Sequence, residues 1–151
     1  MLGSKVRVRK VRIEAFSHAT EDLNKVKKAV LTLLPPDLRD KVEIRVNVVK
    51  GYYGNEIAVM NVEVSKKAKH ILKHILCSLP QTERIIIKAT IDTRVDNKLS
   101  HLFLRLSKQE AYLGRVKLME GSDVIKLVFT IIGIRSFEEL RKFIEELVSN
   151  C

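Results

Sequence analysis

Two histidines at helical spacing are the first residues in this chain that could do chemistry. His70 and His74 stand four residues apart in a segment of helical periodicity, which is the spacing of a two-histidine metal site. No glutamate lies between them to act as a general base, and four lysines between positions 66 and 73 would repel a divalent cation. We therefore expect a solvated basic helix face here and no metal site.

Other catalytic patterns are absent from the sequence or have a structural explanation. The chain contains no Gly-rich phosphate loop, no G-x-S-x-G nucleophile elbow and no dinucleotide-binding fingerprint. Glu21 and Asp22 are adjacent, so on a helix they would point about 100° apart and could not face each other as an acid–base pair. We expect them to complement a helix dipole. The sequence predicts a non-catalytic protein without a metal or cofactor.

The basic side chains indicate the kind of partner better than the catalytic patterns do. The chain has 28 Lys and Arg against 18 Asp and Glu, and residues 1–75 hold 16 of those cations against 8 acids. Arg7, Arg9 and Lys10 fall in the first strand candidate, where cations sharing one strand face can track phosphate groups. An excess of this size favours a polyanionic partner, although strand-edge cations also protect against aggregation.

A second group combines cations with a tyrosine. Its members are Arg105, Lys108, Gln109, Tyr112 and Arg115. An exposed tyrosine beside arginine and lysine offers a stacking surface and charge neutralisation, the two requirements for binding single-stranded or loop RNA. Tyr52 and Tyr53, in a Gly-flanked loop, offer the same. For each tyrosine, packing in the core or in a turn is an equally good interpretation.

Hydrophobic patterning predicts the elements that would position these side chains. Strands are expected at residues 6–16, 42–48, 57–64 and 101–106, followed by a hairpin of 116–119 with 124–132. Helices are expected from an N-cap at Thr20 to Pro35, after Ser65, over 108–113 and from a cap at Ser136. Helices packed on one face of a largely antiparallel sheet make an α+β two-layer sandwich.

Two stretches of this pattern are irregular. The alternation of the first strand changes phase at Arg9 and Lys10, which indicates either a β-bulge or a basic arm that leads into a shorter strand. Residues 81–95 fit two structures, because Ile85 and Ile87 belong to a strand-like alternation while Ile87, Ile91 and Val95 recur at helical spacing. Periodicity alone leaves both structures open.

Chain length and the remaining composition indicate how many domains the protein has and in which cellular compartment we expect it. A chain of 151 residues is the size of one domain, so we expect residues 1–151 to form a single domain, with residues 1–5 disordered. No apolar run approaches the ~20 residues of a membrane span, and the N-terminus lacks the apolar block of a secretory signal. Cys77 and Cys151 lack a metal-type spacing, so we expect no disulfide, Cys77 in the core and a cytoplasmic protein.

Three segments resemble one archaeal family. Residues 16–22, FSHATED, resemble its HATED stretch, and residues 51–57, GYYGNEI, are similar to its GHxGNPI loop. Residues 102–118, LFLRLSKQEAYLGRVKL, resemble its LRLDKQAAYLG segment. The order and spacing of the three agree, so the resemblance spans residues 14–134. The family is the archaeal set of predicted RNA-binding proteins, often described as proposed exosome subunits.

This resemblance implies both a fold and a function. The implied fold is that of the large-subunit ribosomal protein that holds the 5S RNA, with a helix over residues 81–95. The implied function is non-catalytic RNA binding, as an accessory subunit of archaeal RNA processing or degradation associated with the exosome. Glu56, Tyr52 and Ser107 replace the family's usual Pro, His and Asp, which affects loop contacts more than the fold.

An alternative function uses the same basic surface. In this alternative, the protein is an interaction or assembly subunit that docks acidic protein partners. A homodimer is a further expectation, and no membrane partner is expected.

Overall fold

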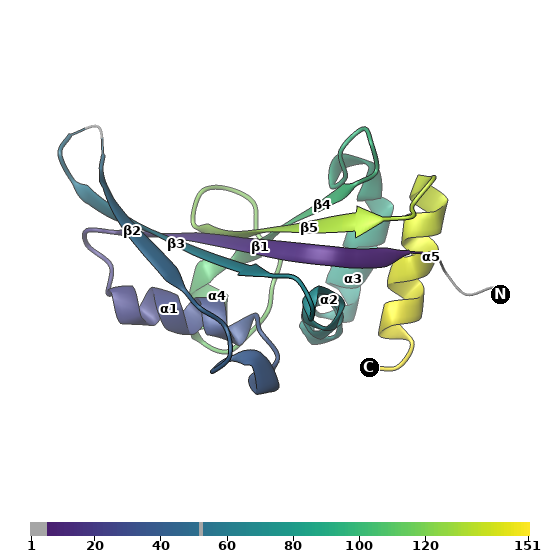
Figure 1. Cartoon of the computed structure of the whole chain (residues 1–151), viewed down its shortest axis with the longest axis horizontal. Helices are drawn as coiled ribbons and strands as arrows, with labels where there is room; N and C mark the ends of the chain where they lie inside the picture. The colour runs from purple at the N-terminus through teal and green to yellow at the C-terminus, as the bar shows by residue number, and fades with distance from the viewer. Residues whose placement is uncertain (1–5, 52) are drawn as a thin grey trace.

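A five-stranded sheet forms one layer of the protein, in the order β2-β3-β1-β5-β4 with every neighbouring pair antiparallel (Figure 1). The computed structural model describes residues 6–51 and 53–151, so the expected disorder of residues 1–5 lies outside the described residues. The strands are β1 (Arg7–His18), β2 (Arg45–Lys50), β3 (Glu56–Val64), β4 (His101–Ser107) and β5 (Val124–Ile132).

Helices supply the second layer. They are α1 (Leu23–Thr32), α2 (Ala68–Ser78), α3 (Gln81–Ala89), α4 (Lys108–Tyr112) and α5 (Phe137–Val148), with 3-10 turns at Pro36–Leu38 and Ile91–Thr93. In Figure 1, α1 and α4 lie under one end of the sheet, and α2, α3 and α5 gather at the other. The predicted α+β sandwich is confirmed. None of the described helices has the length and apolar character needed to cross a bilayer.

The core lies between the two layers. Alternate strand residues point toward the helices and are buried, as Ile13, Leu104 and Phe129 show. On α5 the buried positions recur at helical spacing, and Ser136 caps the helix by accepting a hydrogen bond from the Glu139 N–H at 3.1 Å. Outward-pointing strand residues are mostly exposed or half-buried, so the opposite side of the sheet remains open.

The predicted bulge in β1 is confirmed, and it sets the composition of the open side. The pairing of β1 with β5 shifts by one residue between Val8 and Lys10, so β1 has an extra residue there. The shift allows Val8 and Val11, three residues apart, both to point into the core. The outward positions around the bulge are then all cationic: Arg7, Arg9, Lys10 and Arg12.

The start of α1 differs from the prediction. Asp22 is the N-cap, and its side chain accepts a hydrogen bond from the Asn24 N–H at 2.9 Å, whereas Thr20 lies two residues before the cap. Glu21 turns back instead and accepts a hydrogen bond from the His18 N–H at 3.0 Å. A chain with three consecutive polar residues offers several capping candidates, and the turn after β1 selects among them.

The predicted hairpin of residues 116–119 with 124–132 is wrong. β5 pairs with β1 on one edge and with β4 on the other, so neither edge is available to residues 116–119. That segment instead follows the outer edge of β4, where Leu118 bridges to Leu106 and the Met119 N–H donates to the Arg105 carbonyl at 3.1 Å.

Residues 81–93 are helical, as the family resemblance implies. Ile87 and Ile91, at helical spacing, are fully buried, while Ile85 and Ile86 remain about half exposed. Val95 follows in a bridge to Leu102. The helical periodicity is therefore the feature that the fold uses, and the strand-like alternation is coincidental.

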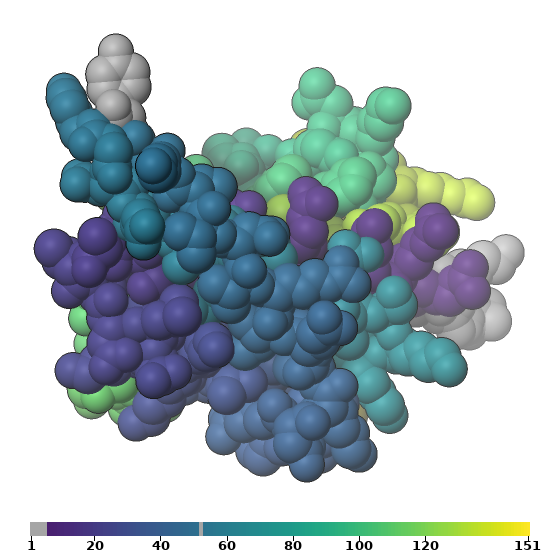
Figure 2. Space-filling model, turned by 60° about the vertical axis from the view of Figure 1, so that its left-hand side comes forward, coloured from purple at the N-terminus to yellow at the C-terminus, as the bar shows by residue number. Residues whose placement is uncertain are grey.

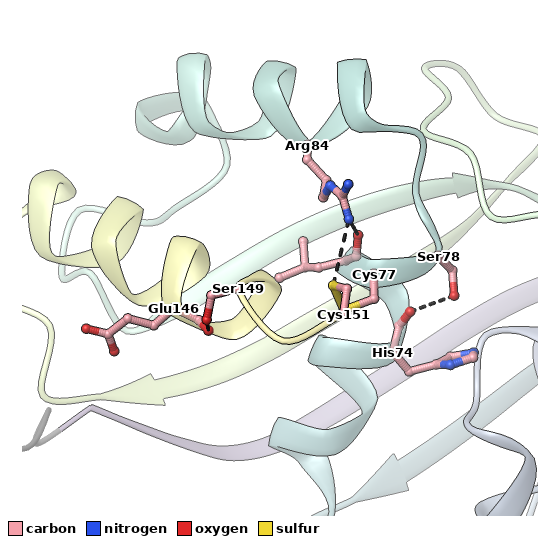
Figure 3. Close-up of a disulfide and its surroundings, with 8 residues drawn as sticks. His74, Cys77, Ser78, Arg84, Glu146, Ser149 and Cys151 are labelled. Carbon is pink, nitrogen blue, oxygen red and sulfur yellow. Dashed lines mark hydrogen bonds between the residues drawn. A yellow bond between two sulfur atoms is a disulfide. The ribbon is translucent and has the colours of Figure 1, made fainter.

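Cys77 and Cys151 form a disulfide that joins the end of α2 to the segment after α5, three residues beyond Val148 (Figure 3). The prediction of no disulfide, with Cys77 as a core thiol, was wrong. The two cysteines are 74 residues apart in the sequence, and only the packing of α5 beside α2 brings their Cα atoms to 5.5 Å. No local spacing signals such a pair.

Candidate nucleic-acid interface

The outward side of the sheet, here called the open face, is rich in cations. Its basic residues are Arg7, Arg9, Lys10 and Arg12 of β1, Arg45 of β2, Arg105 of β4 and Lys126 of β5. Its acidic residues on the same strands are Glu14 and Glu63. Figure 2 shows side chains of β1, in purple, standing out between the blue β2–β3 region and the green of β4.

The strand register places these residues in rows across the sheet. One row crosses all five strands, as Arg45, Asn61, Glu14, Lys126 and Arg105. The next row places Arg12 between Glu63 and Val128, with Phe103 beyond. Cations from distant parts of the chain thus lie on neighbouring strands, which are about 4.8 Å apart.

Few of these cations are neutralised. Lys10 lies 3.8 Å from Glu63, and Arg45 lies 3.7 Å from Glu43, both exposed pairs of small energetic value. Within the described part of the chain, Arg7, Arg9 and Arg12 form no ion pair. The open face therefore carries a net positive charge available to an external anion.

Aromatic side chains accompany the charge. Phe103 on β4 is 44% exposed, and Phe16 on β1 is half-buried with the Lys126 ammonium 6.0 Å from its ring centre. An exposed ring beside cations supplies a stacking surface for a base. Neither phenylalanine was among the residues predicted as RNA contacts.

The predicted cluster between Arg105 and Arg115 does not form one surface. Arg105 is exposed on the open face, but Lys108 is only 3% exposed. The Lys108 ammonium donates to the Phe16 carbonyl at 2.8 Å and to Glu21 Oε1 at 2.9 Å, and lies 3.2 Å from Asp123 Oδ1. Its burial and its partners leave Lys108 without a donor for RNA, so its role is structural.

Gln109, Tyr112 and Arg115 lie on the helix side of the molecule. Gln109 donates to Asp123 at 3.2 Å, and the Tyr112 ring packs against the core with the Lys28 ammonium 4.9 Å from its centre. Arg115 forms a two-pronged pair with Glu110, whose hydrogen bond from Arg115 lowers the pKa of the Glu110 carboxyl. These three residues do not join Arg105, because the chain passes from the sheet into the helix layer at Ser107.

The remaining predicted contact is in the β2–β3 loop. Tyr53 is 87% exposed at the tip of this hairpin, which projects from the body of the protein (Figure 2). Tyr52 lies outside the described residues. Tyr53 is thus accessible to a partner, but at the end of a hairpin and not on the open face.

The histidine pair on α2 is divided between two partners. His70 Nε2 lies 3.1 Å from Asp37 Oδ1, and this hydrogen bond lowers the pKa of the Asp37 carboxyl. His74 Nε2 lies 3.3 Å from the Thr32 carbonyl, and burial lowers the pKa of its ring. Within the described ranges, no three His, Cys, Asp or Glu side chains are grouped as a metal site.

Asp96 fixes the turn that leads into β4. Its carboxylate accepts hydrogen bonds from the Ser100 N–H and hydroxyl at 2.8 and 2.9 Å, and from the His101 N–H at 3.1 Å. The His101 ring nitrogen Nδ1 lies 2.7 Å from Asp96 Oδ2. Desolvation alone would raise the pKa of Asp96, but these hydrogen bonds outweigh it and hold that pKa well below 3.8.

The low pKa of Asp96 makes its contribution to stability pH-dependent. The contribution is present above 3.8, the ordinary value for the unfolded chain, and is lost as the pH falls through the lowered folded-state value. We expect Asp96→Asn to be less stable than the wild type at pH 7, with the difference shrinking below pH ~4. Urea unfolding of both proteins between pH 7 and 2 measures this difference, and one that stays constant across the range would contradict the assignment.

Comparison with known proteins places this fold and surface in a family. A family model described as RNA binding matches residues 10–131. The chain belongs to this RNA-binding family. An RNA-binding protein of Pyrococcus abyssi is 36% identical over 127 residues, covering 82% of each chain. An uncharacterized protein of Methanocaldococcus jannaschii is 32% identical over 142 residues, covering 93% of this chain and 95% of the relative.

Solved structures of the RNA-binding family's relatives agree with the fold. The crystal structure of a DUF54 protein from Archaeglobus fulgidus is 34% identical, with a TM-score of 0.76 over 93% of this chain and 99% of that one. The family's model covers most of β1 and β5 and all of β2, β3 and β4, so it includes five of the seven open-face cations, with Arg7 and Arg9 just before its start. The resemblance to an archaeal RNA-binding family, noted from three motifs, is confirmed.

Proposed function

We propose that this protein is a non-catalytic RNA-binding protein whose RNA lies across the open face. One observation carries the proposal: seven cations from four strands share a sheet surface to which the strands themselves contribute only two carboxylates. Membership of an RNA-binding family and a relative named as an RNA-binding protein support it.

The arrangement suits a phosphate backbone. Cations on neighbouring strands can neutralise successive phosphates, and each such contact releases condensed counterions and adds affinity. Arg7, Arg9 and Arg12 are the best placed, because they have no ion pair to break before they meet a phosphate. Burial of the helix layer's apolar face against the sheet keeps this surface rigid.

A finer role follows from the family resemblance of residues 14–134. We place the protein in the cytoplasm, as an accessory subunit of archaeal RNA processing or degradation that associates with the exosome. The competing role is a subunit that docks acidic proteins on the same face. Affinity purification with and without nuclease distinguishes them, because an RNA-mediated association is lost on digestion and a direct protein complex is not.

RNA binding is tested by fluorescence anisotropy with a labelled single-stranded RNA of mixed sequence across a salt series. We expect affinity to fall steeply with salt, by about 0.7 in log–log slope for each phosphate contact. The double variant Arg9→Gln, Arg12→Gln is expected to bind more weakly, with a slope smaller by about 1.4.

A variant with the same charge change elsewhere is the control. Lys66, before α2, and Lys142, on α5, are both exposed and lie off the sheet. Lys66→Gln, Lys142→Gln is expected to retain both the affinity and the salt slope of the wild type. Wild-type protein that binds no RNA at low salt would refute the function, and equal losses in the two variants would refute the open face as its site.

A further inference from the structure

The β4 edge of the open face contains a hollow of about 730 Å³, formed by β4, β5 and the turn that follows α3. Phe103 and Val128, direct neighbours across the two strands, both line it. Arg94 and Glu120 belong to its lining from the two loops that flank β4. The volume is within the range of small-molecule binding sites, about 300–1,000 Å³.

We propose that this hollow is a pocket for one unstacked nucleotide base, which makes single-stranded RNA the ligand class of the open face. The inference rests on the RNA-binding function proposed above and adds the conformation of the RNA. Four features of the hollow support the proposal: the Phe103 ring, the cations around that ring, the Glu120 carboxylate as a hydrogen-bond acceptor, and the shape of the hollow.

The ring of Phe103 is available for stacking. A phenylalanine on a sheet is normally buried, yet Phe103 is 44% exposed, and its ring centroid lies 6.4 Å from that of His101. Stacking of a base on such a ring strengthens binding at least about fivefold and tolerates any base, because every base has a π-face.

The cations around the ring are arranged for a phosphate. Arg105 and Lys126 are directly opposed on β4 and β5, and like charges in opposed positions destabilise a sheet. Within the described chain, neither forms an ion pair: Arg105 donates only to the Gly121 carbonyl at 3.4 Å, and Lys126 lies over the Phe16 ring. An anion between them would relieve the repulsion.

Arg94 and Glu120 give the hollow polar walls. Arg94 uses its Nε to donate to the Thr90 hydroxyl at 2.9 Å, which fixes the side chain and leaves the two terminal nitrogens for a ligand. Glu120 has no ion pair in the described structure, and its carboxylate can accept hydrogen bonds from an exocyclic amino group of a base. A pocket that combines cations with one acceptor suits a nucleotide better than a simple anion.

The shape of the hollow selects single-stranded RNA. In an RNA duplex the base faces are stacked on each other and the major groove is too narrow for side chains. A ring that lines a hollow can reach a base face only when that base is splayed out of its strand. A duplex would meet the rim cations but not Phe103.

The test compares one labelled RNA strand, alone and annealed to its complement, by fluorescence anisotropy with the full-length protein. We expect the single strand to bind more tightly than the duplex. Phe103→Ala is expected to weaken single-strand binding at least about fivefold without changing the salt slope, because it removes stacking and no phosphate contact. Phe103→Tyr, which keeps an aromatic ring, is expected to restore the affinity.

Phe137 provides the matched control, because it is 40% exposed at the start of α5 and lies off the sheet. Phe137→Ala is expected to bind as the wild type does. If Phe103→Ala keeps wild-type affinity while Arg9→Gln, Arg12→Gln loses it, the pocket is refuted and the open face stands. If the duplex and the single strand bind equally well, single-strand selectivity is refuted, and if neither binds, both proposals fail together.

Discussion

Replacing Lys108 by methionine is expected to lower the free energy of unfolding by about 3 kcal/mol. The ammonium joins three parts of the chain that are far apart in sequence: the Phe16 carbonyl of β1, Glu21 before α1 and Asp123 before β5. Methionine keeps the side-chain length but removes the ammonium donor from the carbonyl and from both carboxylates, of which Glu21 retains the His18 N–H and Asp123 retains Gln109. The loss is at the lower end of that for a broken buried pair, because Glu21 and Asp123 are 24% and 42% exposed and regain water.

Urea unfolding at neutral pH measures this loss. Lys117→Met is the control, because the Lys117 ammonium is 47% exposed and pairs only at 3.6 Å with Glu110. Such a surface pair is worth about 0–1 kcal/mol, so Lys117→Met should change stability little. Equal effects of the two variants would show that Lys108 does not support the fold as described.

The features of the fold that sequence predicts are those set by neighbouring residues. The bulge in β1 is visible because Val8 and Val11 break a two-residue period, and the caps at Ser107 and Ser136 because a serine precedes a helical pattern. For residues 81–93, the pattern of neighbouring residues does not predict the structure. A strand-like alternation and a helical spacing of apolar residues are both present there, and only contacts with the rest of the protein decide between strand and helix.

The candidate site is predictable only in part, because it depends on which strands become neighbours. Arg7, Arg9, Lys10 and Arg105 were identified as cations, and the sheet does bring them to one face. Nothing in the sequence marked Phe103 or Lys126 as a candidate site residue, since they become neighbours only through the pairing of β4 with β5. Conversely, Lys108 is followed in sequence by the exposed Gln109, and only tertiary contacts across 87 residues reveal its burial.

Tyr112 also shows that proximity in sequence does not predict which side chains share a surface. Sequence proximity grouped Tyr112 with Arg105, but the chain enters α4 between them, and the ring packs beside Lys25 and Lys28 of α1. The stacking surface expected from tyrosine is supplied on the open face by phenylalanine. Charge composition therefore indicated a polyanionic partner, whereas strand pairing determines which cations and rings share the open face.

Reduction of the Cys77–Cys151 disulfide is expected to lower the free energy of unfolding by about 4 kcal/mol, the chain-entropy value for a closed loop of this length. The bond closes a loop across a sequence separation of 74 residues and fastens the end of α5 to α2 (Figure 3). Without it the unfolded chain gains freedom, while the native packing of Leu140, Phe143 and Ile144 remains in place.

Urea unfolding with and without a reductant measures the contribution of the disulfide, and the double variant Cys77→Ser, Cys151→Ser is its control. The variant should unfold at the midpoint of the reduced wild type and should not respond to reductant. A wild-type midpoint that is the same in both conditions would contradict the prediction. RNA affinity should not change in either case, because the disulfide lies in the helix layer and the open-face cations that we propose as RNA contacts are held by the strand register.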